Sequence, residues 1–133
     1  MLKILVVEDE LASRKFITHM MEAYGHCDIA VDGIKGVIMF EESMLNGEKY
    51  DLICMDIMMP EMDGQEALKK MREIEKKHSI LPKDEAKVIM TTALSDPKTV
   101  LEAYYKGGAT YYLVKPISTD KIKNIMADIL DSK

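Results

Sequence analysis

Residues 51–64 read DLICMDIMMPEMDG, and the pattern in this segment recurs along the chain. The segment begins with a short run of apolar residues, Leu52–Met55, which is typical of a strand buried on both faces of a sheet. Asp56 follows this run directly, and Pro60 and Gly64 then indicate a loop. Apolar residues recur at helical spacing after the loop, at Ala67, Leu68, Met71 and Ile74. The segment therefore predicts a buried strand, a loop and an amphipathic helix.

The rest of the chain repeats this unit. Further apolar runs predict strands at Leu2–Val7, Cys27–Ala30, Val88–Met90 and Thr110–Val114. Each is followed by a segment with helical periodicity. Strands that alternate with helices form a parallel sheet with helices on both faces and right-handed crossovers. We therefore expect an α/β fold with five strands and five helices in a single domain, residues 1–133.

The periodicity also predicts which helical side chains face the core. They are Phe16, Ile17, Met20, Met21 and Tyr24 in the first helix, Ile34, Val37, Ile38, Met44 and Leu45 in the second, and Ile122, Ile125, Met126, Ile129 and Leu130 in the last. The fourth helix is expected to begin at Asp96–Pro97 and to end at Gly107–Gly108, because proline fits the first helical position and glycine ends helices. Residues 76–87 are polar and predict a long, exposed loop.

The charge and the cysteine content narrow the possible functions. Eighteen basic and 23 acidic residues give a net charge of -5, which argues against binding to nucleic acid. Cys27 and Cys54 form no CxxC motif and fit a reducing compartment as small buried residues. The apolar run at the N-terminus is too short for a signal peptide, and no other run reaches the length of a membrane span. We expect a cytoplasmic protein that does not insert into membranes.

Acidic, hydroxyl and basic side chains follow the predicted strands. Glu8 and Asp9 come after the first strand, Asp56 after the third, Thr91–Thr92 at the end of the fourth, and Lys115 after the fifth. Ligands of parallel α/β sheets bind at the carboxyl ends of the strands, where these residues would meet. Three neighbouring acids repel one another unless a cation joins them, and Mg²⁺ prefers oxygen ligands. A carboxylate there could attack phosphorus and form an aspartyl phosphate.

Read together, these residues resemble the receiver domain of bacterial two-component response regulators. The matching segments are LVVEDE, DLICMDIMMPEMDG, VIMTTALSD and YYLVKP, and the resemblance covers essentially the whole chain. It implies a flavodoxin-like (βα)5 fold, with the strand order 2-1-3-4-5.

The resemblance also implies roles for individual residues. Asp56 matches the phosphoacceptor, and Asp9 matches a direct Mg²⁺ ligand. Glu8 matches the neighbour that holds a metal-bound water, and the backbone carbonyl of Met58 matches a further ligand. Because Met58 and Leu94 offer no acid or amide to orient water, we expect the phosphorylated aspartate to hydrolyse slowly.

The remaining roles concern the switch. Thr92 matches the hydroxyl that moves toward the phosphoryl group, and Lys115 matches the lysine that pairs with it. Tyr112 matches the aromatic residue that turns inward on activation, and Lys115–Pro116 matches a peptide bond that is usually cis.

The resemblance implies a phosphorylation-activated switch and not a turnover enzyme. A sensor histidine kinase or a phosphotransfer protein would supply the phosphoryl group. No output domain follows Lys133, so an unknown protein would dock on the surface formed by residues 96–131, and the protein would be a monomer or a weak, activation-dependent dimer. Three alternatives are disfavoured. A haloacid dehalogenase-type phosphatase needs a second acid where Met58 stands, a receiver that has lost phosphorylation usually lacks one of these residues, and a flavodoxin needs a phosphate loop rich in Ser, Thr and Gly.

Overall fold

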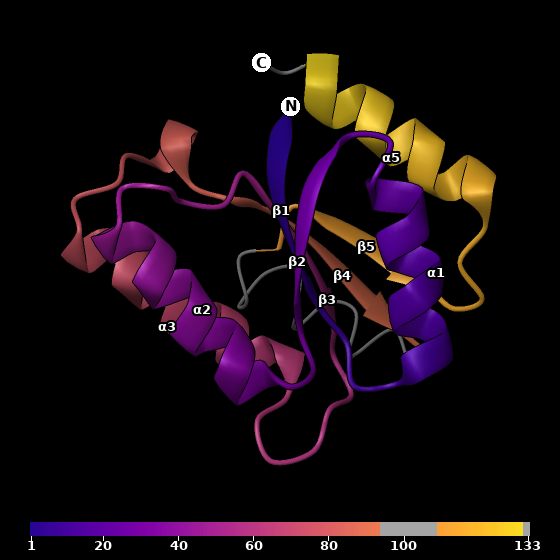
Figure 1. Ribbon diagram of the computed structural model, residues 1–133, viewed down its shortest axis with the longest axis horizontal. Helices are drawn as coiled ribbons and strands as arrows, with labels where there is room; N and C mark the ends of the chain where they lie inside the picture. The colour runs from indigo at the N-terminus through magenta and orange to yellow at the C-terminus, as the bar shows by residue number, and fades with distance from the viewer. Residues whose placement is uncertain (94–108, 132–133) are drawn as a thin grey trace.

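The computed structural model describes residues 1–93 and 109–131, and these form a parallel sheet covered by helices on both faces (Figure 1). The sheet has five strands in the order β2-β1-β3-β4-β5. Their bounds are β1 Leu2–Val7, β2 Gly25–Ala30, β3 Leu52–Asp56, β4 Lys87–Thr92 and β5 Tyr111–Val114. All neighbouring strands are parallel. The predicted α/β fold and strand order are confirmed.

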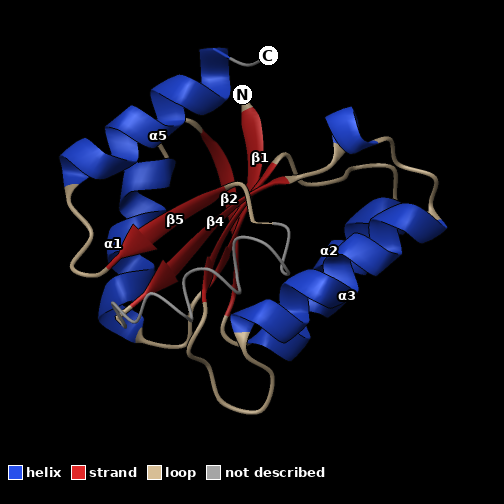
Figure 2. Cartoon of the chain, turned by 180° about the vertical axis from the view of Figure 1, so that it is seen from behind, coloured by secondary structure: helices blue, strands red, loops and turns tan. Residues whose placement is uncertain are grey.

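The helices lie in two layers. Helices α2 (Gly33–Leu45) and α3 (Gly64–Lys77) cover one face of the sheet, and α1 (Leu11–Met21) and α5 (Thr119–Asp131) cover the other (Figure 2). The helix predicted to begin at Asp96–Pro97 lies outside the described residues. Each layer forms its own hydrophobic core with one face of the sheet, which we call the α2/α3 core and the α1/α5 core. The central strands β1 and β3 are buried over almost their whole length, as their continuous apolar runs predict.

Short side chains of acids and hydroxyls fix where several helices begin. The Asp32 carboxylate accepts a hydrogen bond from the Lys35 amide at 2.8 Å, and Asp63 accepts one from the Glu66 amide at 2.9 Å. These N-caps satisfy amide groups that the first turn of a helix leaves unpaired. The Asp63 cap matters for function, because it ends the loop that follows β3.

The predicted core face of α2 is partly wrong. Phe40 is completely buried, whereas Ile34, Ile38 and Leu45 are 39%, 50% and 70% exposed. The helix packs through a face that contains Gly36, where an added Cβ would lie 3.0 Å from the Val7 side chain. A hydrophobicity pattern does not identify a glycine as a contact residue, so the sequence favoured the wrong side. Two further predicted core residues lie outside the core, since Phe16 is 39% and Leu130 44% exposed. Tyr24 follows the end of α1 but packs against the α1/α5 core, as predicted.

Residues 76–87 are more ordered than the sequence predicted. Helix α3 continues to Lys77, and a short 3-10 helix, Pro82–Asp84, follows before β4. The buried carboxylate of Glu75 accepts hydrogen bonds from the Ala86 amide at 2.8 Å and from Arg72 at 2.7 Å. The connection is therefore anchored at its base, and only its outer part is exposed as expected.

Candidate functional site

Three carboxylates meet at the carboxyl ends of β1 and β3. Glu8 and Asp9 follow β1 directly, and Asp56 is the last residue of β3. One oxygen from each lies within 4.8 Å of the others. Because β1 and β3 are neighbours in the sheet, acids that are far apart in the sequence reach the same point. Glu8 and Asp56 are buried, whereas Asp9 is exposed.

Lys115 brings one positive charge to these acids. Its Nζ donates a hydrogen bond to Glu8 Oε1 at 2.8 Å and lies 3.5 Å from Asp56 Oδ2. The Lys115 amide donates to the Thr92 carbonyl at 2.7 Å, which fixes the end of β5 against β4. The Lys115–Pro116 peptide bond is cis, as predicted. The stronger contact of Lys115 is therefore with Glu8, and the contact with Asp56 is at the limit of a hydrogen bond.

The crowding of these charges shifts the pKa values of Glu8 and Lys115. Burial, together with a hydrogen bond and repulsion from Asp56, raises the pKa of Glu8 from 4.5 to about 7, although Lys115 opposes the shift. Burial by itself would lower the pKa of Lys115, but the hydrogen bond that it donates to Glu8 and the attraction of the Glu8 and Asp56 carboxylates raise it overall. The site thus holds more negative charge than its own lysine neutralises.

These residues fit a divalent cation. Glu8 Oε2 is buried and has no hydrogen-bond partner among the described residues, although a buried carboxylate oxygen normally has one. Asp9 in the same cluster is open to solvent, so an ion with its waters has access. The Met58 amide donates to Asp56 Oδ1 at 3.3 Å, which orients the phosphoacceptor predicted from the sequence. The metal role of the Met58 carbonyl stays a prediction.

The residues predicted to switch lie at the neighbouring strand ends. Thr91 and Thr92 are both buried at the end of β4. Tyr111 packs against the α1/α5 core and Tyr112 against the α2/α3 core, so the predicted alternation across the strand is confirmed. Burial raises the pKa of Tyr112. The structure brings Thr92 next to Lys115 in the sheet, while the movements assigned to Thr92 and Tyr112 stay predictions.

Comparison with known proteins agrees with this arrangement. The family model for the response regulator receiver domain matches residues 4–127. The chain belongs to the receiver domain family. It is 37% identical to the chemotaxis protein CheY of Treponema pallidum over 130 residues, which are 96% of this chain and 82% of that protein. A CheY homolog of Campylobacter jejuni is 32% identical over 129 residues, with 97% and 92% covered.

Solved structures show the same fold. The CheX-CheY-BeF3-Mg²⁺ complex from Borrelia burgdorferi contains a chain that matches with a TM-score of 0.81 and 27% identity, covering 97% of this chain and 89% of that one. The chain is therefore a CheY-like receiver domain of two-component signalling. Of the residues that its sequence matched to the family, Glu8, Asp9, Asp56 and Lys115 meet at one edge of the sheet, and Leu94 lies outside the described residues.

The sequence did not identify Arg14 as part of the site of this receiver domain. Its guanidinium donates hydrogen bonds to the backbone carbonyls of Glu8 at 3.1 Å and Asp9 at 3.4 Å. It therefore holds the turn that carries both acids. The only sequence signal is its position five and six residues after the two acids, and many basic residues with no special role stand at such a position.

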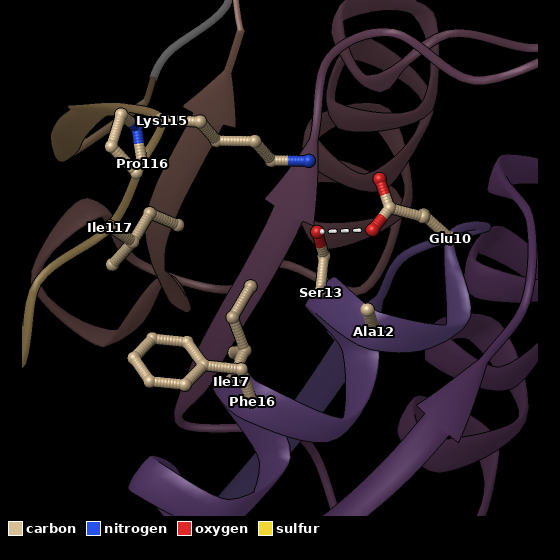
Figure 3. A pocket seen from close by; sticks show the side chains of 8 residues that line it. All are labelled: Glu10, Ala12, Ser13, Phe16, Ile17, Lys115, Pro116 and Ile117. Carbon is tan, nitrogen blue, oxygen red and sulfur yellow. Dashed lines mark hydrogen bonds between the residues drawn. The ribbon is translucent and has the colours of Figure 1, made fainter.

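A pocket of about 530 Å³ opens beside Lys115, between the first half of α1 and the segment that joins β5 to α5. Its wall is mostly apolar, with Phe16 and Ile17 facing Pro116 and Ile117 (Figure 3). Ser13 Oγ donates to Glu10 Oε1 at 3.2 Å at the rim. The exposure of Phe16, which the sequence had placed in the core, is explained by this pocket.

The raised pKa of Glu8 predicts how the stability of the receiver domain depends on pH in metal-free buffer. The folded state binds the Glu8 proton up to pH 7, whereas an ordinary glutamate loses it near pH 4.5. The free energy of unfolding therefore falls as the pH rises through this window, and the loss is complete above it. We expect Glu8→Gln to remove this loss and to be about 2 kcal/mol more stable than the wild type at pH 8.

Urea unfolding of both proteins at pH 5 and pH 8 measures this difference. Glu10→Gln is the matched control, because Glu10 is an exposed acid two residues away. The prediction would be contradicted if the free energy of unfolding changed equally between pH 5 and pH 8 in the wild type and in Glu8→Gln.

Proposed function

We propose that this receiver domain is a phosphorylation-activated switch that accepts a phosphoryl group on Asp56 in the presence of Mg²⁺. The observation that carries the proposal is the position of Asp56 between a lysine and two further acids, one of which has a buried oxygen without a partner. This arrangement stabilises little as it stands, because in the described part of the chain three acids lie together and one ammonium group pairs with two of them. It suits a reaction in which a cation and a phosphoryl group join them.

In the proposed reaction a carboxylate oxygen of Asp56 attacks the phosphorus of a phosphohistidine. The new O–P bond forms as the P–N bond breaks, and its electrons return to the departing imidazole of a sensor histidine kinase or phosphotransfer protein. Asp9, Asp56 and the Met58 carbonyl would hold Mg²⁺, with Glu8 acting through water, and the ion supplies positive charge to the phosphoryl oxygens. The Met58 amide keeps Asp56 in position.

Phosphorylation then redistributes the contacts of Lys115. The phosphoryl group adds a charge of about -1.5 to -2, which competes with Glu8 for the lysine and attracts the Thr92 hydroxyl. Movement of Thr92 makes room for Tyr112, and the surface of residues 96–131 changes its affinity for a downstream protein. The chain then acts as a switch and not as a turnover enzyme. Its free cysteines fit action in the cytoplasm, and none of the described helices combines the length and hydropathy needed to cross a membrane.

Intact mass spectrometry after incubation with acetyl phosphate tests the proposal. We expect the wild type to gain the mass of one phosphoryl group with Mg²⁺ and none with EDTA. Asp56→Asn should gain nothing under either condition, because the amide is not a nucleophile. Glu61→Gln, an exposed acid in the same loop, is the control and should react like the wild type. An adduct on Asp56→Asn, or one that forms equally without Mg²⁺, would refute the assignment.

A further inference from the structure

Helix α2 is apolar on the side that faces away from the sheet as well as on the side that packs against it. Ile34, Ile38 and Leu45 are exposed, and steps of four and seven residues place them within an arc of about 40° around the helix. We call these three residues the α2 stripe. Gly36 and Phe40 point to the opposite side, where the helix is buried. A helix with apolar residues on two opposite sides is normally covered on both, so the stripe indicates a surface that forms a contact.

The proposed function does not explain the α2 stripe. The acids and Lys115 come from the ends of β1, β3 and β5. The described part of the proposed output surface, residues 109–131, contains α5, which covers the other face of the sheet (Figure 1). Neither the phosphorylation site nor α5 therefore uses the outward face of α2.

The charges beside the stripe indicate what covers it. Lys35 and Glu42 are both exposed and are seven residues apart, so they lie along the same flank of the helix. Lys35 is near the beginning of α2, and Glu42 is near its end. If a second copy packs antiparallel against α2 about a two-fold axis, Lys35 of each copy lies beside Glu42 of the other. The same axis brings Ile34 of one copy against Leu45 of the other, with Ile38 near the centre.

We propose that the α2 stripe is the interface of a symmetric homodimer in which two α2 helices pack antiparallel. The midpoint between Ile34 and Leu45 and the midpoint between Lys35 and Glu42 lie within one residue of each other, near positions 38–40. A single two-fold axis can therefore pair both the apolar and the charged residues. Such self-complementarity is what a two-fold interface requires. The interface is small compared with the roughly 1,600 Å² of a standard complex, so the dimer forms at high protein concentration and dissociates on dilution.

Glu41 lies about 20° outside this arc, and a carboxylate covered without a partner would oppose association. It borders a groove of about 290 Å³ between α2 and α3, which is also lined by Lys70, Glu73 and Lys77. Lys70 and Lys77 therefore offer Glu41 two ammonium groups across the groove, against the one further acid, Glu73. The acid therefore does not prevent the two helices from packing.

Sedimentation velocity over a range of concentrations tests the dimer with the unmodified protein. We expect reversible self-association of the wild type. Ile38→Glu should weaken it about 100-fold, because a loss of about tenfold at each site occurs twice in a two-fold interface. Leu81→Glu is the matched control, since Leu81 is similarly exposed, at 55%, in the connection before β4, and it should associate like the wild type. Circular dichroism checks that both variants fold.

Charge exchange provides a second test that does not depend on the apolar residues. Lys35→Glu and Glu42→Lys should each weaken association about fivefold, because each places like charges together. The double variant, Lys35→Glu with Glu42→Lys, should associate like the wild type. A wild type that stays monomeric at millimolar concentration would overturn the proposal. So would a dimer that Ile38→Glu leaves intact, or a double variant no better than the two single ones.

Discussion

Mg²⁺ at about one hundred times its dissociation constant is expected to raise the free energy of unfolding by about 2.7 kcal/mol. For a chain of 133 residues this raises the melting temperature by about 10 °C. The reason lies in the uncompensated charge of the site, where three carboxylates meet and Lys115 is the one lysine that pairs with Glu8 and Asp56 among the described residues. A divalent cation removes this repulsion, and it binds the folded state alone because only folding brings the three acids together.

Substitutions of the acids separate this effect from a general effect of ions. Asp9→Asn should remove most of the stabilisation by Mg²⁺, since Asp9 is exposed and its loss disturbs little else. Asp56→Asn should also reduce it, and should raise the stability of the metal-free protein by removing a charge that repels Glu8. Glu10→Gln is the control and should respond to Mg²⁺ like the wild type. Melting curves by differential scanning fluorimetry with Mg²⁺ and with EDTA give all of these values.

Two results would contradict the metal site. One is a melting temperature that Mg²⁺ leaves unchanged at millimolar concentration. The other is an equal increase in the wild type and in Asp9→Asn, which would mean that the ion acts elsewhere on the protein.

Most of the fold could be predicted from the sequence because buried parallel strands have a simple signature. The continuous apolar runs of β1 and β3 predicted the two central strands, and polar residues directly after them predicted one edge of the sheet as the site. The rule that parallel strands bring their carboxyl ends together was then sufficient to place Glu8, Asp56 and Lys115 in contact. The strand order and the individual roles came from the resemblance to receiver domains.

The parts that could not be predicted depend on contacts between elements. Gly36 is the contact residue of α2 because the helix comes close to Val7 of β1, and hydrophobic periodicity gives a glycine no weight. In the sequence, Glu75 is one of several acids in a charged helix. Only the structure shows that it is buried and that it accepts hydrogen bonds from Ala86 and Arg72. These residues satisfy packing or hydrogen-bonding needs that arise only when distant segments meet.

The closer contact of Lys115 with Glu8 than with Asp56 could not be predicted from the sequence either. The family match implies a lysine that pairs with a phosphoryl group on Asp56, whereas in this structure its shorter contact is with Glu8. The end of β1 therefore shares the lysine with Asp56. In the proposed function, Lys115 would have to exchange its contact with Glu8 for one with the phosphoryl group.

Gly64→Ala is expected to destabilise the protein by about 3 kcal/mol, although alanine favours helices more than glycine does. Gly64 is the first residue of α3, and helix propensity alone predicts that the substitution stabilises it. A Cβ at this position would lie 2.4 Å from the carbonyl oxygen of Asp56 and 2.9 Å from the Cα of Ile57. Both are backbone atoms, so relief of the clash requires the loop after β3 to move. A gain in stability would therefore favour the argument from helix propensity, and a loss would favour the argument from the backbone clash.

Gly47→Ala is the matched control for Gly64→Ala. Gly47 has a φ of 73° and nothing within 4 Å of an added Cβ, so alanine there meets only backbone strain of about 1 kcal/mol. Urea unfolding should give Gly64→Ala a clearly lower free energy of unfolding than Gly47→Ala. Because the moving loop also carries the Met58 amide that orients Asp56, phosphorylation by acetyl phosphate should slow in Gly64→Ala and stay unchanged in Gly47→Ala. A Gly64→Ala protein as stable as the wild type would mean that this loop adapts freely, and Asp56 would then owe its position to Lys115 and the strand alone.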